Sequence, residues 1–408
     1  MIYKNDLLVI GGGAAGFFGA LAAAKHNTSL KIVLLEKSTH LLSKVKISGG
    51  SRCNVTHDLT DKKAFSEKYP RGSKHVFRLL HQLSVEDTID WFMQRGVELK
   101  AELDGRMFPV TDRSQTIIDC LMNEAKSYGI EIRVSETVLE ILKETDGFHV
   151  KTSAGQILTK NILIATGGHP RTEGFNWLKE MGFNIEQPVP SLFTFNLPDH
   201  PLKNLMGVAQ EVRLSVDGAK LRETGPMLIT HWGFSGPAVL RASAWGAREL
   251  AALNYNFTVR INWMPELNPE DIREWLQKQR VSSGKKLVVS RIFDSLTQRL
   301  WEALCSRAGI NNEVKWAELP AKNFNRLIET ITADGYQVRG KTTFKEEFVT
   351  CGGVSLNDID SQTCEAKKIP GLFFAGEVLD VDGITGGFNF QHAWSSGFVA
   401  GKAIAKRS

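Results

Sequence analysis

The feature that most constrains this chain is a glycine-rich turn near its start, between two short apolar segments. Asp6–Ile10 is short and almost continuously apolar, as expected for a parallel strand that is buried on both faces. The turn that follows, residues 11–16, reads Gly-Gly-Gly-Ala-Ala-Gly and fits the spacing G-x-G-x-x-G. The next ten residues read as a helix, and a second short strand ends in Glu36. Strand, turn, helix and strand in this order are typical of a dinucleotide-binding unit.

Each glycine of this turn has a physical role. Gly11 permits a sharp turn, Gly13 lets the backbone approach a diphosphate, and Gly16 lets the helix lie close to the strand. The N–H groups and the positive dipole end at the start of the helix can then bind the diphosphate. We therefore expect a dinucleotide cofactor to contact Gly11, Gly13, Ala14, Ala15 and Gly16.

The acid at the end of the second strand narrows the choice of nucleotide. Glu36 can accept hydrogen bonds from an adenosine ribose, and its charge would repel a 2′-phosphate, which disfavours NADP. We expect the neighbouring Lys37 to contact the cofactor as well. The fingerprint by itself leaves an NAD site, an FAD site and a purely structural turn open. The uncharged run 7–24 could also be a signal peptide or a membrane span, but the glycines inside it argue against a continuous apolar helix.

A second glycine-rich segment, near the end of the chain, favours FAD. An apolar strand over 372–375 runs into Gly376 and Glu377, which places a carboxylate where it could bind ribityl hydroxyls. Further glycines lead to a helix that starts near Asn389, and the N-terminus of such a helix can stabilise the negative charge of a reduced flavin. An NAD dehydrogenase has no need of this second element. The expected contacts are Gly376, Glu377, Gly386, Gly387, Phe388, Asn389 and Gln391.

The middle of the chain supports the same choice. Residues 161–168 form an apolar strand that ends in Ala-Thr-Gly-Gly and resembles the A-T-G turn of two-dinucleotide-type flavoproteins. No second G-x-G-x-x-G occurs in the sequence, so we expect no dedicated NAD(P)H domain. The further cofactor contacts expected here are Val138, at the adenine, and Ala165, Thr166 and Gly167.

With these residues in view, the chain is similar to a bacterial flavoprotein family that includes aminoacetone-oxidase-like and bile-acid Δ4,6-reductase-like proteins. The resemblance is carried by K-V-K-I-S-G-G-S-R-C-N at 44–54, by G-P-M-L-I-T-H-W-G-F-S-G-P at 225–237, and by a closing segment made of V-T-C-G-G-V at 349–354 and residues 376–391. The first motif adds expected cofactor contacts at Lys44, Ser48, Gly49, Gly50, Arg52, Cys53 and Asn54. The chain departs from the family pattern at Ser51, Pro226 and His57.

The resemblance implies an FAD-binding domain that is split in the sequence and carries two inserts. The expected fold is α/β, a Rossmann-like FAD-binding domain of the two-dinucleotide type with an inserted small β-barrel and a helical subdomain. In the first part, αβ alternation includes helical stretches near 74–95 and 115–128. We assign residues 1–188 and 343–408 to the FAD-binding domain, 189–265 with 333–342 to the barrel, and 266–332 to the helical insert.

The expected activity is that of an FAD-dependent oxidoreductase. FAD carries the redox chemistry, and we expect hydride transfer at the flavin N5 involving a small-molecule substrate. An oxidase re-oxidised by oxygen and a reductase supplied by free NADH or NADPH are both open. The catalytic candidates are His231 as an acid or base, Arg52 as an anion-binding group and Asn54 as a hydrogen-bonding partner of the flavin. For His231 a structural role in its turn is favoured, and an RNA-linked or non-catalytic flavin-binding protein is the alternative function.

Composition excludes several other classes. The net charge of +5 comes without a dense Lys/Arg block, so we expect neither a nucleic-acid nor a membrane partner. The five cysteines lack C-x-x-C spacing, which argues against disulfides and metal sites and favours a reducing cytoplasm. Cys53 is expected to be inert packing.

The 36 glycines are about seven more than usual, and we expect this surplus, Gly352 and Gly353 included, to lie in loops near FAD. The oligomeric state is open.

Overall fold

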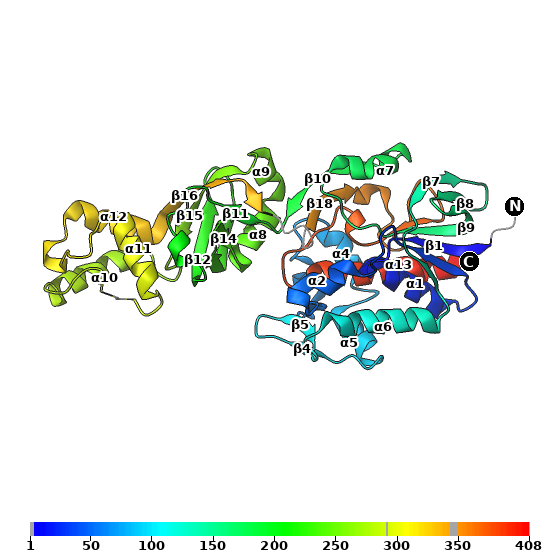
Figure 1. Cartoon of the computed structure of the whole chain (residues 1–408), viewed down its shortest axis with the longest axis horizontal. Helices are drawn as coiled ribbons and strands as arrows, with labels where there is room; N and C mark the ends of the chain where they lie inside the picture. The colour runs from blue at the N-terminus through cyan, green and yellow to red at the C-terminus, as the bar shows by residue number, and fades with distance from the viewer. Residues whose placement is uncertain (1–3, 291–292, 343–348, 408) are drawn as a thin grey trace. The chain divides into compact units, whose positions relative to one another are not determined.

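The computed structural model describes residues 4–290, 293–342 and 349–407 and divides the chain into two compact units (Figure 1). The first unit joins the two ends of the chain, Met1–Ser191 with Lys345–Ser408, and the second unit is Leu192–Phe344. The α/β fold class with its Rossmann-like domain is confirmed. The residue boundaries of the three expected domains stay a prediction, and the expected return point at residue 343 lies outside the described residues.

The first unit is built on a sheet of parallel strands with an antiparallel hairpin beside it. Its strands are β1 Asn5–Ile10, β2 Ile32–Leu35, β6 Glu131–Arg133, β7 Val138–Lys143, β8 Phe148–Thr152, β9 Gly155–Ile164 and β19 Leu372–Phe374. β1 pairs in parallel with β2 on one side and with β9 on the other, and β6 and β19 extend the sheet. β7 and β8 run antiparallel beside the first half of β9. The last four residues of β1 are all buried, as a strand packed on both faces requires.

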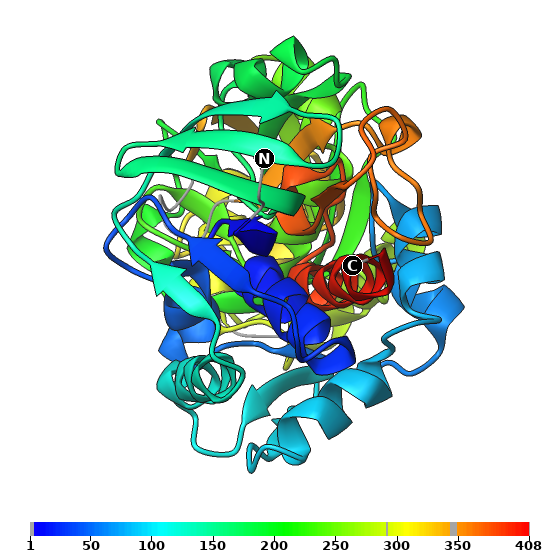
Figure 2. The same cartoon turned by 90° about the vertical axis from the view of Figure 1, so that its right-hand side faces the viewer.

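Two long helices, α1 (Ala14–His26) and α13 (Phe388–Arg407), cross beside this sheet and are blue and red in Figure 2. Glycines make the crossing possible. A Cβ on Gly401 would lie 2.1 Å from the carbonyl oxygen of Gly19, and a Cβ on Gly397 would meet the α1 backbone at 2.5 Å. Real Cβ atoms do not approach backbone this closely, so the first and last long helices of the chain can touch only at glycine.

The helix expected over 74–95 is in fact two helices, α4 (Ser73–Leu79) and α5 (Val85–Met93). The break has a local cause, because Ser84 and Asp87 form a capping box that starts a new helix inside the apolar pattern. The remaining elements of this unit are α2 Ser43–Ser51, β3 Thr56–His57, α3 Lys62–Ser66, β4 Leu99–Ala101, β5 Arg106–Pro109, α6 Ser114–Ser127, α7 Asn176–Glu180, β10 Ile185–Ser191 and β18 Val349–Val354.

The second unit contains an antiparallel sheet of short strands. They are β11 Thr194–Asn196, β12 Ala209–Val216, β13 Arg222–Ile229, β14 Gly233–Ser235, β15 Asn256–Asn262, β16 Asp334–Arg339 and β17 Lys341–Thr342, with α8 Pro237–Trp245 and α9 Ala247–Ala252 between them. β16 and β17 stand at opposite ends of the strand order but are consecutive in the chain. They meet at Gly340, which donates to Tyr255 O (2.8 Å) and accepts from Asn196 N–H (3.3 Å). The sheet therefore closes on itself as a small barrel.

Three helices complete the second unit, α10 (Pro269–Ser282), α11 (Gln298–Arg307) and α12 (Ala321–Ala333). α10 begins at Pro269, directly after Asn268, whose side chain forms a capping box with Asp271. The apolar faces of the helices share one continuous core with the barrel strands. Among the residues that the structure describes, no helix is long and apolar enough to cross a membrane.

The close crossing of α1 and α13 predicts that a glycine-to-alanine change at the contact lowers the stability of the fold. Gly401→Ala would place a Cβ 2.1 Å from Gly19 O, and because the helices must then separate, we expect the free energy of unfolding to fall by about 1–3 kcal/mol. Lys402→Ala, one position later on the same helix, should change it by less than about 0.5 kcal/mol. Urea unfolding followed by circular dichroism measures both, and equal stability of G401A and wild type would contradict the close crossing.

Candidate functional site

Three glycine turns that are far apart in the sequence meet at the carboxyl ends of the parallel strands. A Cβ on Gly11, after β1, would lie 2.3 Å from the carbonyl oxygen of Ala165, after β9. The N–H of Ala165 donates to Ile10 O at 2.9 Å. After β19, a Cβ on Gly376 would lie 2.8 Å from the Cβ of Ala15. The turns therefore form one edge of the sheet, which is where doubly wound folds bind their ligands.

The start of α1 has the features of an anion-binding site. Its N-cap is Gly13, and within the described part of the chain no side chain caps the helix and no acid lies in its first turn. α1 therefore begins three residues earlier than expected. A Cβ on Gly13 would meet nothing within 4 Å, whereas a Cβ on Gly16 would lie 2.0 Å from Gly11 O. The backbone faces open space at Gly13, and the N–H groups beside it can bind a diphosphate.

Glu36 is held at the tip of β2, facing this turn. Its carboxylate accepts hydrogen bonds from the N–H groups of Gly12 (2.9 Å) and Ser38 (2.8 Å). Its carbonyl oxygen accepts from the N–H of Glu136 at 3.0 Å, which brings the strand that starts at Val138 beside it. The two residues expected at the adenosine, Glu36 and Val138, are therefore brought together, and Lys37 is exposed.

Lys44 and Glu377, which are 333 positions apart, form an ion pair with Nζ and Oε2 separated by 2.5 Å. The second carboxylate oxygen of Glu377 accepts from the N–H of Thr350 at 2.8 Å. The hydroxyl oxygen of Thr350 is buried and has no hydrogen-bond partner among the described residues. No sequence pattern singles out Thr350, because an isolated threonine in an apolar strand is ordinary.

The segment after the first turns of α2 directs Asn54 toward the C-terminal loop. Gly49 and Gly50 have φ of 57° and 69°, which breaks the helix. The Oδ1 of Asn54 lies 2.9 Å from the position that a Cβ on Gly387 would take. This Oδ1 is buried and has no hydrogen-bond partner among the described residues. A buried acceptor without a donor is costly, and the imide N–H of a flavin ring is a donor of the right kind.

The residues present fit FAD. At Gly13, Gly50 and Gly167 a Cβ would meet nothing within 4 Å, so the backbone at all three faces open space. Asn54 Oδ1 and Thr350 Oγ1 are buried polar atoms without protein partners among the described residues. The uncapped helix start suits a diphosphate and Glu36 suits a ribose, while Asn54 suits the flavin ring.

The loop between β19 and α13, residues 380–387, is held by residues that we did not single out from the sequence. Asp382 is fully buried and pairs through both carboxylate oxygens with Arg71, whose Nε lies 2.6 Å away. It also accepts from the Ser191 hydroxyl at 2.7 Å. Burial raises the pKa of Asp382, and Arg71 opposes this effect. The partners of Asp382 are distant in the sequence. The one sequence signal for this anchor is therefore an acidic residue inside a glycine-rich loop.

His57, one of the departures from the family pattern, supports the same loop. Its ring stacks on Phe388 with centroids 4.7 Å apart, and its Nδ1 lies 2.9 Å from Gly386 O. Gly105 makes room for the ring, because a Cβ there would lie 2.5 Å from Nε2. Burial lowers the pKa of His57. The neutral ring therefore donates from Nδ1 to the glycine carbonyl.

Two expected cofactor contacts at the start of α13 use their side chains on protein groups. The Asn389 amide accepts from Gly383 N–H (2.8 Å) and donates to Gly383 O (3.0 Å). Gln391 is fully buried, accepts from the Thr56 hydroxyl (2.6 Å) and donates to Thr88 Oγ1 (2.8 Å). We infer that both residues shape the loop and that their contact with FAD runs through the backbone.

Arg52 and Cys53, the two expected contacts that precede Asn54, have different surroundings: Arg52 forms ion pairs and Cys53 is buried. Arg52 pairs with Glu102 (2.6 Å) and with Asp112 (3.5 Å), and its guanidinium carbon lies 3.9 Å from the Phe108 ring centroid. An anionic substrate would have to compete with two carboxylates for it. Cys53 is buried, and burial raises the pKa of its thiol to about 12. The thiol is therefore protonated at neutral pH, which suits inert packing.

His231 belongs to the second unit and lies in the turn between β13 and β14. Its side chain is exposed, and its ring lies 4.3 Å from that of Trp232. The turn is held by Thr230, whose hydroxyl donates to Gly233 O at 2.9 Å. His231 is therefore accessible to solvent, and its neighbour supplies the structural role that we favoured for it.

Two buried histidines face each other behind the loop that precedes α13. The ring centroids of His75 and His392 are 6.1 Å apart, and neither Nε2 has a hydrogen-bond partner among the described residues. Burial lowers the pKa of His75 to about 4, with a smaller contribution from Arg78. Burial likewise lowers the pKa of His392 to about 3. Both rings are neutral at pH 7.

Part of the glycine surplus lies outside the loops in which we expected it. Gly352 and Gly353 lie in strand β18 rather than in a loop, and a Cβ on either would lie 2.5 Å from a carbonyl oxygen. At Gly387, in the loop before α13, a Cβ would likewise lie too close to a carbonyl oxygen, 2.3 Å from Thr56 O. These glycines let backbone pack on backbone, and that packing gives the candidate site its shape.

Comparison with known proteins gives a match along the whole chain. A family model described as HI0933-like protein Rossmann domain matches residues 5–403. The chain is 31% identical over 412 residues to ribosomal RNA dihydrouridine synthase of Escherichia coli K12, with 98% of each chain covered. It is 26% identical over 416 residues to 3-dehydro-bile acid delta(4,6)-reductase of Clostridium scindens, with 99% of this chain and 100% of the relative covered.

A solved structure with a similar fold is 3-ketosteroid-delta4-(5alpha)-dehydrogenase from Rhodococcus jostii RHA1. The TM-score is 0.52 and the sequence identity is 13%, with 99% of this chain and 97% of that chain covered. At this identity the likeness concerns the fold.

The unpartnered oxygen of Asn54 leads to a prediction about cofactor affinity. Asn54→Leu roughly keeps the side-chain volume and removes the acceptor. Because one buried hydrogen bond to the flavin is then lost, FAD should bind about tenfold to hundredfold more weakly. The apoprotein should not lose stability, because this oxygen has no described protein partner. Fluorescence titration of apoprotein with FAD measures the affinity, with the exposed Asn325→Leu as the control. Equal affinities of N54L and wild type would remove Asn54 from the site.

The two buried histidines predict a loss of stability in acid. Because burial lowers the pKa of His75 from 6.5 to about 4, the unfolded chain binds more protons than the folded chain between these pH values. Stability is therefore complete above about pH 6.5 and falls as the pH falls toward 4. His75→Phe should flatten this fall in urea midpoints measured across the range, whereas Leu80→Ala should lower them equally at every pH. An unchanged slope in H75F would contradict the neutral, buried His75.

Proposed function

The chain belongs to the HI0933-like protein family and is an FAD-dependent oxidoreductase, and we propose that it reduces a carbon–carbon double bond conjugated to a carbonyl group. One observation carries this proposal: two relatives that match along the whole chain are named for different substrates but for the same kind of bond. Dihydrouridine is uridine whose C5–C6 double bond, conjugated to the C4 carbonyl, has been saturated. The 4 and 6 double bonds of a 3-dehydro-bile acid form a dienone.

The candidate site suits this role because it binds and orients one redox cofactor. Once bound and reduced, FAD would supply a hydride from its N5. The start of α1 and Glu36 would hold the diphosphate and the adenosine ribose, and Asn54 would satisfy the imide of the ring. The first turn of α13 contains no acid, so its N-terminus would stabilise negative charge on the ring. Electrons would come from NADH or NADPH in solution, because the sequence contains one dinucleotide fingerprint.

Reduction of a conjugated double bond also needs a proton. The hydride adds to the β-carbon, and the α-carbon then takes a proton from a general acid or from water. We propose His231 as this acid, since its imidazole is exposed and the turn that carries it is fixed by Thr230. Arg52, paired with two carboxylates, is the less suited of the candidates.

The proposal predicts which compounds oxidise the reduced enzyme. Without oxygen, protein reduced by NADH or NADPH should recover its flavin absorbance at about 450 nm when mixed with 2-cyclohexenone, a steroid 4,6-dien-3-one or uridine in RNA. Cyclohexanone, which lacks the double bond, should have no effect. His231→Gln should slow this recovery with an unchanged FAD content.

Two results would contradict the proposal. A protein that none of these compounds re-oxidises, while oxygen re-oxidises it rapidly, would be an oxidase. If the purified protein is colourless and cannot be reconstituted with FAD, the assignment of FAD as its cofactor is wrong.

A further inference from the structure

The excess positive charge of this chain belongs to the second unit. Residues 192–344 contain 20 Lys and Arg against 15 Asp and Glu, whereas the rest of the chain contains 30 of each. The net charge of +5 is therefore that of the inserted unit, and the unit with the FAD site is neutral. An uneven distribution of this kind attracts an anionic partner to one part of a protein.

Within the second unit, one group of cations that form no ion pair with described residues lies at the end of α10. The 19 residues between Glu274 and Asp294 contain no acid. The described cations of this stretch, which we call the α10 basic surface, are Lys278, Arg280, Lys285 and Lys286. The three lysines are exposed, and none of the four forms an ion pair with a described residue. Arg273, earlier on the same helix, does pair with Glu270 at 3.6 Å.

The backbone that carries Lys285 and Lys286 is fixed by hydrogen bonds. The carbonyl oxygen of Lys286 accepts from Trp316 N–H (3.0 Å), and that of Gly284 accepts from Ala317 N–H (3.0 Å). Val288 donates to Val314 O (2.9 Å), so the whole turn pairs with the segment before α12. The lysines therefore extend from a rigid turn, which lowers the entropy cost of binding at this surface.

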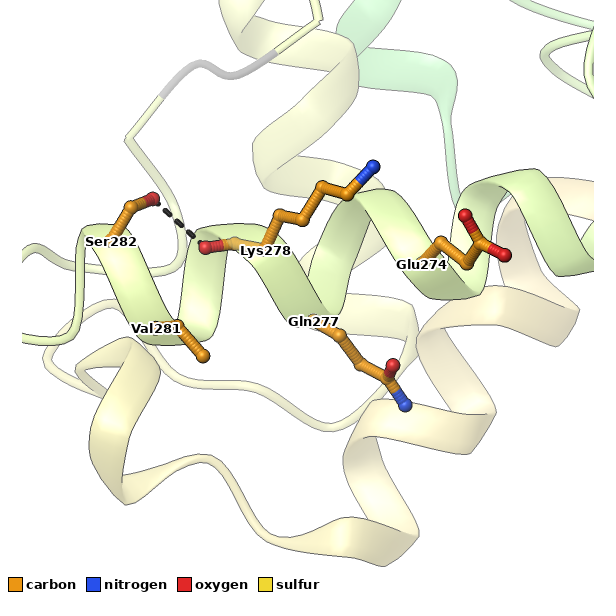
Figure 3. A pocket seen from close by; sticks show the side chains of 5 residues that line it. All are labelled: Glu274, Gln277, Lys278, Val281 and Ser282. Carbon is orange, nitrogen blue, oxygen red and sulfur yellow. Dashed lines mark hydrogen bonds between the residues drawn. The ribbon is translucent and has the colours of Figure 1, made fainter.

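The outer face of α10 adds neutral hydrogen-bonding groups to these cations. Figure 3 shows the side chains that line a shallow hollow of 540 Å³ on this face: Glu274, Gln277, Lys278, Val281 and Ser282. They follow the i, i+3, i+4, i+7 spacing of one helix face. Val281 is 88% exposed, while the apolar side chains Ile272 and Leu276 are buried in the core. The face offers ammonium, amide and hydroxyl groups, with the carboxylate of Glu274 at its N-terminal end, but no apolar stripe.

We propose that the α10 basic surface binds the phosphate backbone of a structured RNA. Lysines bind phosphates as point charges, and amide and hydroxyl groups are common partners of RNA phosphates and sugars. A membrane partner is less suited, because interfacial helices bury a face of large apolar residues. The face of α10 that lines the hollow has one apolar side chain, Val281, while Ile272 and Leu276 lie in the protein core. The inference rests on the proposed function, with a uracil base in RNA as the conjugated substrate, as the name of the 31% identical relative suggests.

The test compares two triple variants with the same change in net charge. Lys278→Gln/Lys285→Gln/Lys286→Gln removes three charges from the α10 basic surface, and Lys126→Gln/Lys151→Gln/Lys179→Gln removes three exposed lysines from the neutral first unit. The probe is a transcribed ribosomal RNA hairpin, titrated in about 50–200 mM salt. The first variant should bind at least about tenfold more weakly at 100 mM salt, with a salt slope smaller by about 2, whereas the second should bind like wild type.

The same preparations separate this inference from the proposed function. Turnover of 2-cyclohexenone should be equal in both variants and in wild type, because the changed residues lie outside the candidate site. Weaker RNA binding with intact enone turnover supports the surface, and lost enone turnover in the wild type counts against the proposed function alone. Equal RNA affinity of both variants, or binding to phosphatidylserine vesicles in place of the hairpin, would overturn the RNA surface.

Discussion

The close crossing of α1 and α13 is the contact on which the rest of this structure depends. The first of these helices follows the fingerprint turn and the second follows the loop of residues 380–387, so their approach brings the two halves of the FAD site to one sheet edge. The approach is possible only because Gly397 and Gly401 lack side chains. A single Cβ at this crossing would separate the diphosphate end of the site from the flavin end, although neither end contains the changed residue.

The sequence was sufficient for the parts of the site that depend on local pattern. The spacing of Gly11, Gly13 and Gly16 before an apolar helix, with Glu36 at the next strand end, has few structural solutions, and the structure has the expected one. The barrel was recognisable from alternating strands and family motifs. The break between α4 and α5 was missed, because the apolar periodicity continues across it and the decisive signal is the short capping box at Ser84.

The parts that could not be predicted depend on partners distant in the sequence. Asp382 is an ordinary acid in the sequence, but burial beside Arg71 and Ser191 makes it an anchor of the loop that precedes α13. Asn389 and Gln391 look like ligand-binding side chains, but their amides are used on Gly383 and on Thr56 and Thr88. No local sequence pattern separates an amide that binds a cofactor from one that supports a loop. Asn54 can be recognised as a candidate cofactor contact only in the folded chain, where its Oδ1 is buried without a partner among the described residues.

The central claim is that the FAD held at this edge passes its electrons to a conjugated double bond, and a single turnover tests it most directly. The protein is reduced by one equivalent of dithionite in D2O without oxygen and mixed with 2-cyclohexenone, and the product is analysed by mass spectrometry. The account predicts one equivalent of cyclohexanone carrying two deuterium atoms for each reduced flavin, with the flavin fully oxidised. A flavin that stays reduced, with no saturated ketone formed, would contradict it.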